Sequence, residues 1–443
     1  MNNNMFLKLG AILTTMTLGT SSWGQSRQIP APVQSQPIVI HSATIHTVSG
    51  DTIVNGYVAF DQGIITAIGQ GSPPNIRNAQ LRDATGLHVY PGLIAANTNL
   101  GLSETGAVPI THDFNEFGDF TPETRCIIAV NPDTDLIPVT RANGILTAVT
   151  SPSGGVIAGR NAIIRLDGWT WEDLAIQAEA GLILSWPSQR GRRFRGFGPR
   201  RNPEDRQKRY REGIERIEQF FEDASAYLKA KDHSDILETD LRFEAMRPFV
   251  MGEKPIYVQA SSQSQIEEAV AFAQRRSLKI IIVGGFEADR ASATLVKNNV
   301  PVILNGLHRL PSARHSDYDE PFTLPLRLHE AGVKFCIASG TGSAHERNLN
   351  HITATAAAYG LPKLEALRSI TLNAAEILGL GDTHGSIETG KTATLIVTTG
   401  DPLEITTDVI LAYIDGRDID LGSRHKQLFL KYREKYKQLG LIE

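Results

Sequence analysis

The segment at residues 89–100, which reads Val-Tyr-Pro-Gly-Leu-Ile-Ala-Ala-Asn-Thr-Asn-Leu, constrains the fold most strongly. Pro91 and Gly92 indicate a turn, and the apolar run after them predicts a β-strand. Because side chains alternate along a strand, Asn97 and Asn99 project to the same face. Two histidines at this spacing could chelate one metal ion, but both positions carry amides here.

Seven further apolar runs also have the character of strands. Helical patterns, such as residues 265–273, separate several of them, as a (β/α)8 barrel requires. A longer apolar stripe predicts one helix over residues 362–380. The predicted fold class is therefore α/β with a TIM-type barrel, whose strands are expected at residues 89–96, 145–151, 162–167, 181–187, 255–260, 279–284, 301–305 and 333–339.

Short alternating runs punctuated by Gly and Asp lie near both ends of the chain, at residues 38–69 and 385–417. This pattern predicts one small β-sandwich built from the two terminal segments. The expected domains are listed in chain order: 1–24 signal peptide, 36–88 and 384–420 β-sandwich, 89–383 barrel with a basic and charged insertion at about 190–235, and 421–443 C-terminal helix.

Residues 1–24 contain Lys8, a short apolar stretch and small residues up to Gly24. They predict a cleaved secretory signal and a periplasmic or secreted protein without a membrane span, because the apolar stretch is too short to cross a bilayer. The net charge of −4 is too mild to indicate a polyanionic partner. A disulfide between Cys126 and Cys336 is not expected, and Cys336 is interpreted as a buried thiol.

The segment Pro91-Gly92-Leu93-Ile94 resembles the first barrel strand of the metal-dependent amidohydrolases, which usually reads Pro-Gly-hydrophobic-Ile-Asp-x-His-x-His. Residues 385–395 resemble the Gly-x-Leu-x-x-Gly-Lys-x-Ala-Asp-Leu segment of the same superfamily, with Thr394 where Asp is common. The chain is similar to the imidazolonepropionase-like branch. This resemblance implies a barrel that hydrolyses non-peptide C–N bonds, for example in cyclic amides, with Zn²⁺ or another divalent metal.

The ligand positions that this resemblance implies do not carry metal ligands. Asn97 and Asn99 replace the first His pair, and Gln259 and Gly284 stand where the fifth and sixth strands would each supply His. Gly342 replaces the Asp that follows the eighth strand. We therefore expect no metal cofactor and a loss of the metal-dependent mechanism, because nothing would lower the pKa of a bound water.

Other polar residues remain near the expected strand ends. The candidates for a neutral polar pocket are Asn97, Asn99, Gln259, Ser339 and Thr341. Further polar residues lie on loops and are interpreted mainly as surface residues: Glu104, His112, Asp113, Asn305, His308, His345 and Arg347.

Three functions remain open from the sequence. The chain is a non-hydrolytic or binding subunit, an active amidohydrolase with atypical ligands, or a small-solute-binding protein. The expected partner is a second copy or a metal-bearing paralogue, with the helix at residues 424–439 either forming the interface or sealing the barrel. Six arginines at residues 190–201 are interpreted as a solvated insertion over the barrel mouth rather than a nucleic-acid site.

Overall fold

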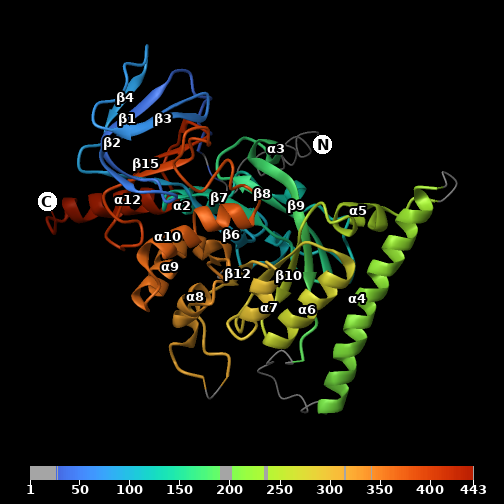
Figure 1. Cartoon of the computed structure of the whole chain (residues 1–443). Coiled ribbons are helices and arrows are strands. Elements are labelled where there is room, and N and C mark those ends of the chain that lie inside the picture. Colours follow the sequence, from blue (N-terminus) through green and yellow to red (C-terminus); the bar gives the residue numbers. More distant parts are fainter. Residues whose placement is uncertain are drawn as a thin grey trace, which may run out of the picture.

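The computed structural model describes residues 26, 28–189, 202–233, 238–313, 316–340 and 342–442. Two eight-stranded sheets form its framework, one in the barrel and one built from both terminal segments (Figure 1). The expected signal peptide and all six arginines of residues 190–201 lie outside the described residues. Both cysteines are free and buried.

The barrel strands follow one another in chain order around the sheet, and the last strand, β13, lies beside the first, β6. This arrangement confirms the predicted TIM-type barrel. Its strands are β6 (Leu93–Thr98), β7 (Ile145–Thr150), β8 (Ile157–Arg165), β9 (Ala175–Ser185), β10 (Ile256–Ala260), β11 (Ile280–Gly284), β12 (Val302–Asn305) and β13 (Phe335–Ala338).

One strand departs from the regular barrel. β8 runs antiparallel to both β7 and β9, so the chain makes a hairpin where a parallel barrel would have a helical crossover. The first half of β9 is polar, and its Glu179 forms ion pairs with Arg160 on β8 at 2.7 Å and with Arg125 at 2.8 Å. These pairs satisfy charges that would otherwise be unfavourable within a sheet.

The predicted first strand at residues 89–96 divides between the two sheets. β5 (His88–Pro91) pairs with β14 (Leu395–Thr398) in the terminal sheet, and β6 begins at Leu93 in the barrel. Gly92 therefore links the two sheets.

The terminal sheet combines strands from both ends of the chain, as predicted. Alternation along β14 places Leu395 and Val397 in the core of this sheet, whereas Ile396 packs into the barrel core. The other strands are β1 (Ile38–His46), β2 (Thr52–Asp61), β3 (Ile64–Gln70), β4 (Gln80–Asp83), β15 (Val409–Ile414) and β16 (Arg417–Asp418).

Helices cover the outside of the barrel. α6 (Gln263–Arg276) begins with a capping box in which the side chains of Ser262 and Gln265 each bond the other's backbone N–H. The others are α2 (Leu136–Arg141), α3 (Trp171–Leu174), α5 (Leu241–Val250), α7 (Ser292–Lys297), α8 (Glu320–Glu330) and α9 (Leu349–Ala358), with 3-10 turns η1 (Pro109–Thr111), η2 (Cys126–Ala129) and η3 (Ser343–Asn348).

The single helix expected over residues 362–380 is instead two short helices, α10 (Lys363–Ser369) and α11 (Leu372–Ile377). The break occurs at Thr371, whose φ of −133° and ψ of −97° are not helical. There the backbone turns away to pair with the barrel, since the Ile370 carbonyl accepts a bond from the Ile94 N–H at 2.8 Å.

Two helices extend beyond the barrel. The long helix α4 (Pro203–Lys231) lies along its side (Figure 1), where Phe221 packs edge-on against Phe272 of α6. The helix that follows the arginine-rich segment is thus partly buried. The C-terminal helix α12 (Arg424–Gln438) buries none of its residues. Among the described residues, no helix has the length and apolarity needed to cross a membrane.

Candidate functional site at the barrel mouth

The candidate site lies at the C-terminal ends of the barrel strands, where enzymes of this architecture hold their chemistry. The interior below it is apolar, and one buried cluster takes residues from all eight strands, among them Ile183, Tyr257, Ile281 and Cys336. The polar mouth therefore lies above a layer of buried, mainly apolar side chains.

Asn97 and Asn99 lie at the end of β6 and just beyond it, and both are half-buried. The Asn99 Oδ1 accepts a hydrogen bond from the backbone N–H of Ser343 at 3.2 Å. Because Ser343 follows Gly342, the structure brings the first-strand position and the eighth-strand position together. Ser339 lies nearby after β13, whereas Thr341 lies outside the described residues.

Gln259 lies near the end of β10 and is half-buried. Its Oε1 accepts a hydrogen bond from the Ser185 hydroxyl on the neighbouring strand β9 at 3.1 Å. The amide is thus oriented by its neighbour, and its Nε2 still has the capacity to donate hydrogen bonds.

The two glycines at expected ligand positions differ in how much space surrounds them. At Gly284 the φ is +109°, and a Cβ would lie 2.6 Å from the Ser261 Oγ. A histidine there would be both strained and crowded. At Gly342 a Cβ would meet nothing within 4 Å, so a side chain would fit.

A buried carboxyl group, which the sequence analysis did not select, belongs to this region. Glu346 on η3 is fully buried, and its Oε2 accepts a hydrogen bond from the Ser339 hydroxyl at 2.8 Å. Burial raises the pKa of Glu346 to about 7, although hydrogen bonds from Ser339 and Thr98 oppose the shift. Its burial could not be predicted, since His345-Glu346-Arg347 has the composition of an exposed loop.

The loop residues considered above do not converge into a catalytic group. Glu104 is held by Asn131 at 3.0 Å and Thr134 at 2.6 Å, and burial raises its pKa. The His308 ring is bonded to the Thr355 hydroxyl at 2.9 Å, and His345 is exposed. The His112 ring bonds the backbone carbonyl of Thr105 at 3.3 Å. The adjacent Asp113 is exposed.

The residues at the mouth do not fit a divalent metal. Amide oxygens from Asn97, Asn99 and Gln259 are weak ligands for Zn²⁺, and glycine offers no side chain. Across the part of the chain that the structure describes, no three His, Cys, Asp or Glu side chains gather closely enough to hold a metal ion. What the mouth does offer is neutral hydrogen-bonding groups and one buried carboxyl group.

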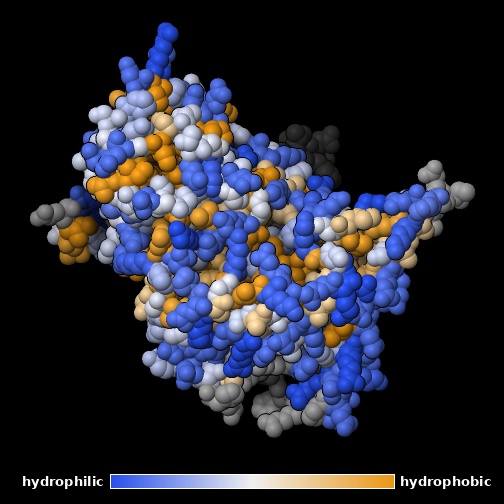
Figure 2. Space-filling model, viewed as in Figure 1, coloured by the Kyte–Doolittle hydropathy of each residue, from blue (hydrophilic) through white to orange (hydrophobic). Residues whose placement is uncertain are grey.

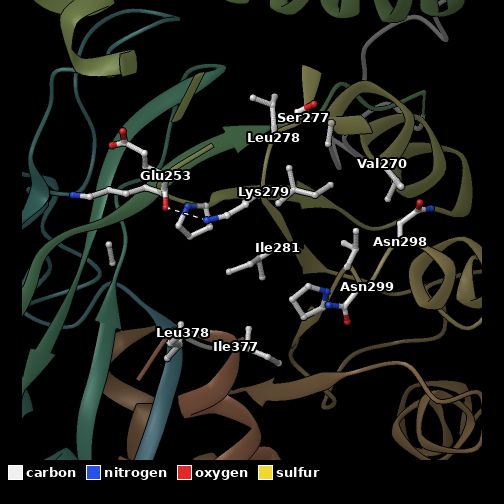
Figure 3. Close-up of a pocket in the computed structure, with 18 of the residues that line it drawn as sticks. Glu253, Val270, Ser277, Leu278, Lys279, Ile281, Asn298, Asn299, Ile377 and Leu378 are labelled. Atoms are coloured by element: carbon white, nitrogen blue, oxygen red, sulfur yellow. Dashed lines mark hydrogen bonds between the residues drawn. The ribbon is translucent and has the colours of Figure 1, made fainter. Parts of the chain in front are cut away.

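A separate cavity lies at the opposite end of the barrel. It has a volume of about 590 Å³ and opens at the N-terminal ends of β9 to β12 (Figure 3). Ile281, Ile377 and Leu378 form an apolar floor, and Lys279 at the rim donates to the Glu253 carbonyl at 3.5 Å. This cavity is separate from the strand ends that carry chemistry in such barrels.

Comparison with known proteins agrees with this architecture. The family model described as "Amidohydrolase family" matches residues 254–418, which include β10 to β15. Over these residues the chain is similar to the amidohydrolase family. The match covers the second half of the barrel and the return into the terminal sheet, where the strand pattern is most regular.

Individual relatives extend the likeness over most of the chain. The amidohydrolase tasK of Hapsidospora irregularis is 23% identical over 400 residues, which cover 82% of this chain but only 39% of that protein. The imidazolonepropionase of Flavobacterium johnsoniae is 37% identical over 81 residues, covering 18% of this chain and 20% of the relative. The chain thus spans well under half the length of tasK, and its alignment with the second relative is short.

A solved structure, the amidohydrolase from Thermotoga maritima, superposes with a TM-score of 0.75 and 24% identity. The alignment covers 86% of this chain and 99% of that protein. The whole fold, terminal sheet and barrel together, is therefore shared with a known amidohydrolase.

Proposed function

We propose that this chain is an exported amidohydrolase-family protein that has lost the metal-dependent mechanism and serves as a non-hydrolytic, binding subunit. The observation that carries the proposal is the set of residues at the five ligand positions: three amides and two glycines, at 97, 99, 259, 284 and 342. The steric closure around Gly284 supports it further, because histidine cannot be accommodated there without movement of the neighbouring loop.

The mouth has the chemistry to bind a small neutral polar molecule. Amide side chains both donate and accept hydrogen bonds, so Asn97, Asn99 and Gln259 suit carbonyl and N–H groups of a ligand. The bond between Gln259 and Ser185 fixes the direction of one amide before a ligand arrives, which lowers the entropic cost of binding. Without a metal, no group here generates hydroxide from water at neutral pH.

Glu346 favours a second candidate, an active amidohydrolase with an atypical site. A carboxyl group with a pKa near 7 can act as a general acid or base at neutral pH. Its complete burial argues against direct contact with a substrate. The Glu346→Gln variant separates the two functions, because any hydrolysis of cyclic amides that depends on this carboxyl group would fall by about a hundredfold or more.

Elemental analysis tests the loss of the metal mechanism. Protein purified without chelator should hold far less than one Zn²⁺, Mn²⁺ or Fe²⁺ per chain, and added metal should produce no hydrolysis of cyclic amides. Stoichiometric metal that survives gel filtration would overturn the proposal and favour an active enzyme.

The role as a subunit needs its own measurement. Light scattering on the purified chain, followed by mixing with a purified metal-bearing amidohydrolase of the same source, would detect self-association or a mixed complex. A strict monomer that binds no such relative would leave solute binding as the better account of the mouth.

A further inference from the structure

The C-terminal helix α12 is the least buried element among those that the structure describes in full. Its first turn is attached to the body, since the Ser423 hydroxyl caps the Lys426 N–H at 3.3 Å and Arg424 pairs with Asp135 at 3.2 Å. Beyond that turn the helix projects from the molecule below the terminal sheet (Figure 1). It does not seal the barrel, which was one of the two roles expected for it.

One face of α12 is apolar. At 3.6 residues per turn, Leu428, Tyr432, Tyr436 and Leu439 share a face, and Phe429 borders it. Leu428 is 42% exposed, Tyr432 50% and Phe429 63%. Figure 2 shows apolar side chains at the surface where the end of the helix projects. A soluble helix normally buries such a face, so these side chains are available to a partner.

Basic residues flank this face on both sides. On the helical projection, Lys426, Arg433 and Lys437 lie along one edge and Arg424, Lys431 and Lys435 along the other. The helix carries six Lys and Arg residues against a single acid, Glu434, which gives it a net charge of +5. The chain as a whole has a net charge of −4, so this helix is strongly positive within a chain that is negative overall.

The positive charge of α12 indicates which kind of partner its apolar face binds. Two copies of α12 packed against each other would bring two charges of +5 together, which is unfavourable. An anionic phospholipid surface complements the charge, and it also accepts the apolar side chains while the lysines remain in the headgroup region. Tyr432 and Tyr436 suit the boundary between acyl chains and headgroups, where amphipathic rings accumulate.

We infer that α12 is a membrane-surface anchor, which lays its apolar face into an anionic phospholipid bilayer and holds the barrel beside that membrane. The helix lies in the interface and does not cross the bilayer. This role is independent of the chemistry at the barrel mouth, so it stands whether or not the mouth hydrolyses a substrate.

Vesicle flotation with the full chain tests the inference. Phosphatidylcholine vesicles that contain phosphatidylglycerol should retain the protein, vesicles of phosphatidylcholine alone should not, and added salt should release it. Lys435→Glu should weaken binding about tenfold or more, because each basic residue near an anionic surface contributes about 1 kcal/mol. Phe429→Ser should weaken it by a similar factor through the loss of apolar burial.

Matched controls come from other exposed positions. Lys229→Glu makes the same charge change on α4, and Phe117→Ser removes a phenylalanine that is 97% exposed. Both controls should bind vesicles as the parent chain does, and circular dichroism should show that all four variants fold.

Three results would overturn the inference: no binding to either kind of vesicle, equal binding to both, or equal loss in the variants and their controls. A dimer in light scattering that Lys435→Glu and Phe429→Ser dissociate, without vesicle binding by the parent chain, would also overturn it. That result would instead make α12 an interface between copies.

Discussion

The buried carboxyl group of Glu346 makes the stability of this protein depend on pH. Its pKa is about 7 in the folded chain, against an ordinary value of 4.5, because burial disfavours the charged form. Between these two values the folded state retains a proton that the unfolded state releases. The free energy of unfolding therefore falls as pH rises from about 4.5 through about 7, by roughly 3 kcal/mol at most.

Glu346→Gln tests this dependence. The variant carries no titrating group at this position, so it should lose less stability between about pH 5 and about pH 8 than the parent chain. Urea unfolding at both pH values measures the difference. Glu215→Gln, which changes an exposed carboxylate on α4, should leave the parent profile unaltered. Parallel profiles for the parent chain and Glu346→Gln would show that the carboxyl group is already ionised when buried.

Gly92, between the two sheets, is constrained by space rather than by backbone conformation. Its φ is not positive, but a Cβ would lie 2.8 Å from the Leu146 Cδ1 and 3.1 Å from the Leu146 Cβ. The Pro91-Gly92 pair alone suggests that a turn requires glycine here, whereas in the structure it is the approach of β7 that leaves no room for a side chain. Only the tertiary pairing of β6 with β7 reveals that contact.

Gly92→Val should lower the free energy of unfolding by about 1–3 kcal/mol, as overpacking of a core does. The cost should be smaller when Leu146→Ala is also present, and a double-mutant cycle of thermal unfolding measures that coupling. Gly106→Val serves as control, because its Cβ would meet nothing within 4 Å. Additive effects of the two core changes would exclude the contact with Leu146 as the cause.

At the scale of elements, local sequence predicted which segments are strands better than how those strands run. Each of the eight barrel strands overlaps an apolar run that predicted it, because burial on both faces of a strand favours continuous apolar sequence. Composition does not predict the reversed direction of β8, since antiparallel and parallel neighbours accept the same side chains. The polar start of β9 was missed for a related reason: the ion pairs of Glu179 that stabilise it join residues far apart in the sequence.

The start of α6, the helix after β10, is set by residues close together in the sequence, which form a capping box. Ser262 accepts from the Gln265 N–H at 3.4 Å, and Gln265 returns a bond to the Ser262 N–H at 3.1 Å. Ser262→Ala should lower the free energy of unfolding by about 1 kcal/mol, whereas Ser262→Asp should retain most of the cap. Chemical denaturation of the parent chain and the two variants measures these free energies. Equal losses in both variants would show that the Ser262 hydroxyl stabilises the protein by some means other than capping.

For the molecule as a whole, the fold is that of the amidohydrolase from Thermotoga maritima, whereas the positions that the sequence resemblance assigns to metal ligands carry amides and glycines. Sequence resemblance identified those positions, but it did not reveal that Gly284 has no room for a side chain while Gly342 has. Steric access depends on the neighbouring loop, and in particular on the Ser261 hydroxyl. The structure also brings Asn99 within hydrogen-bonding distance of the residue after Gly342, so the ends of the first and last barrel strands lie together.

A ligand-restored variant tests whether this scaffold still supports a metal site. Combining Asn97→His, Asn99→His, Gln259→His and Gly342→Asp supplies three imidazoles and one carboxylate, a set suited to tetrahedral Zn²⁺. We expect this variant to bind about one Zn²⁺ per chain and to gain thermal stability when Zn²⁺ is added, because a ligand that binds only the folded state stabilises it. Asn97→Ala with Asn99→Ala, as the matched control, should gain neither property.

Adding Gly284→His should lower stability in the absence of metal, since that side chain meets Ser261. If the restored variant folds but its melting temperature is unchanged by Zn²⁺, the strand ends do not have the spacing of a metal centre. The mouth would then differ from a metal site in backbone geometry as well as in side chains.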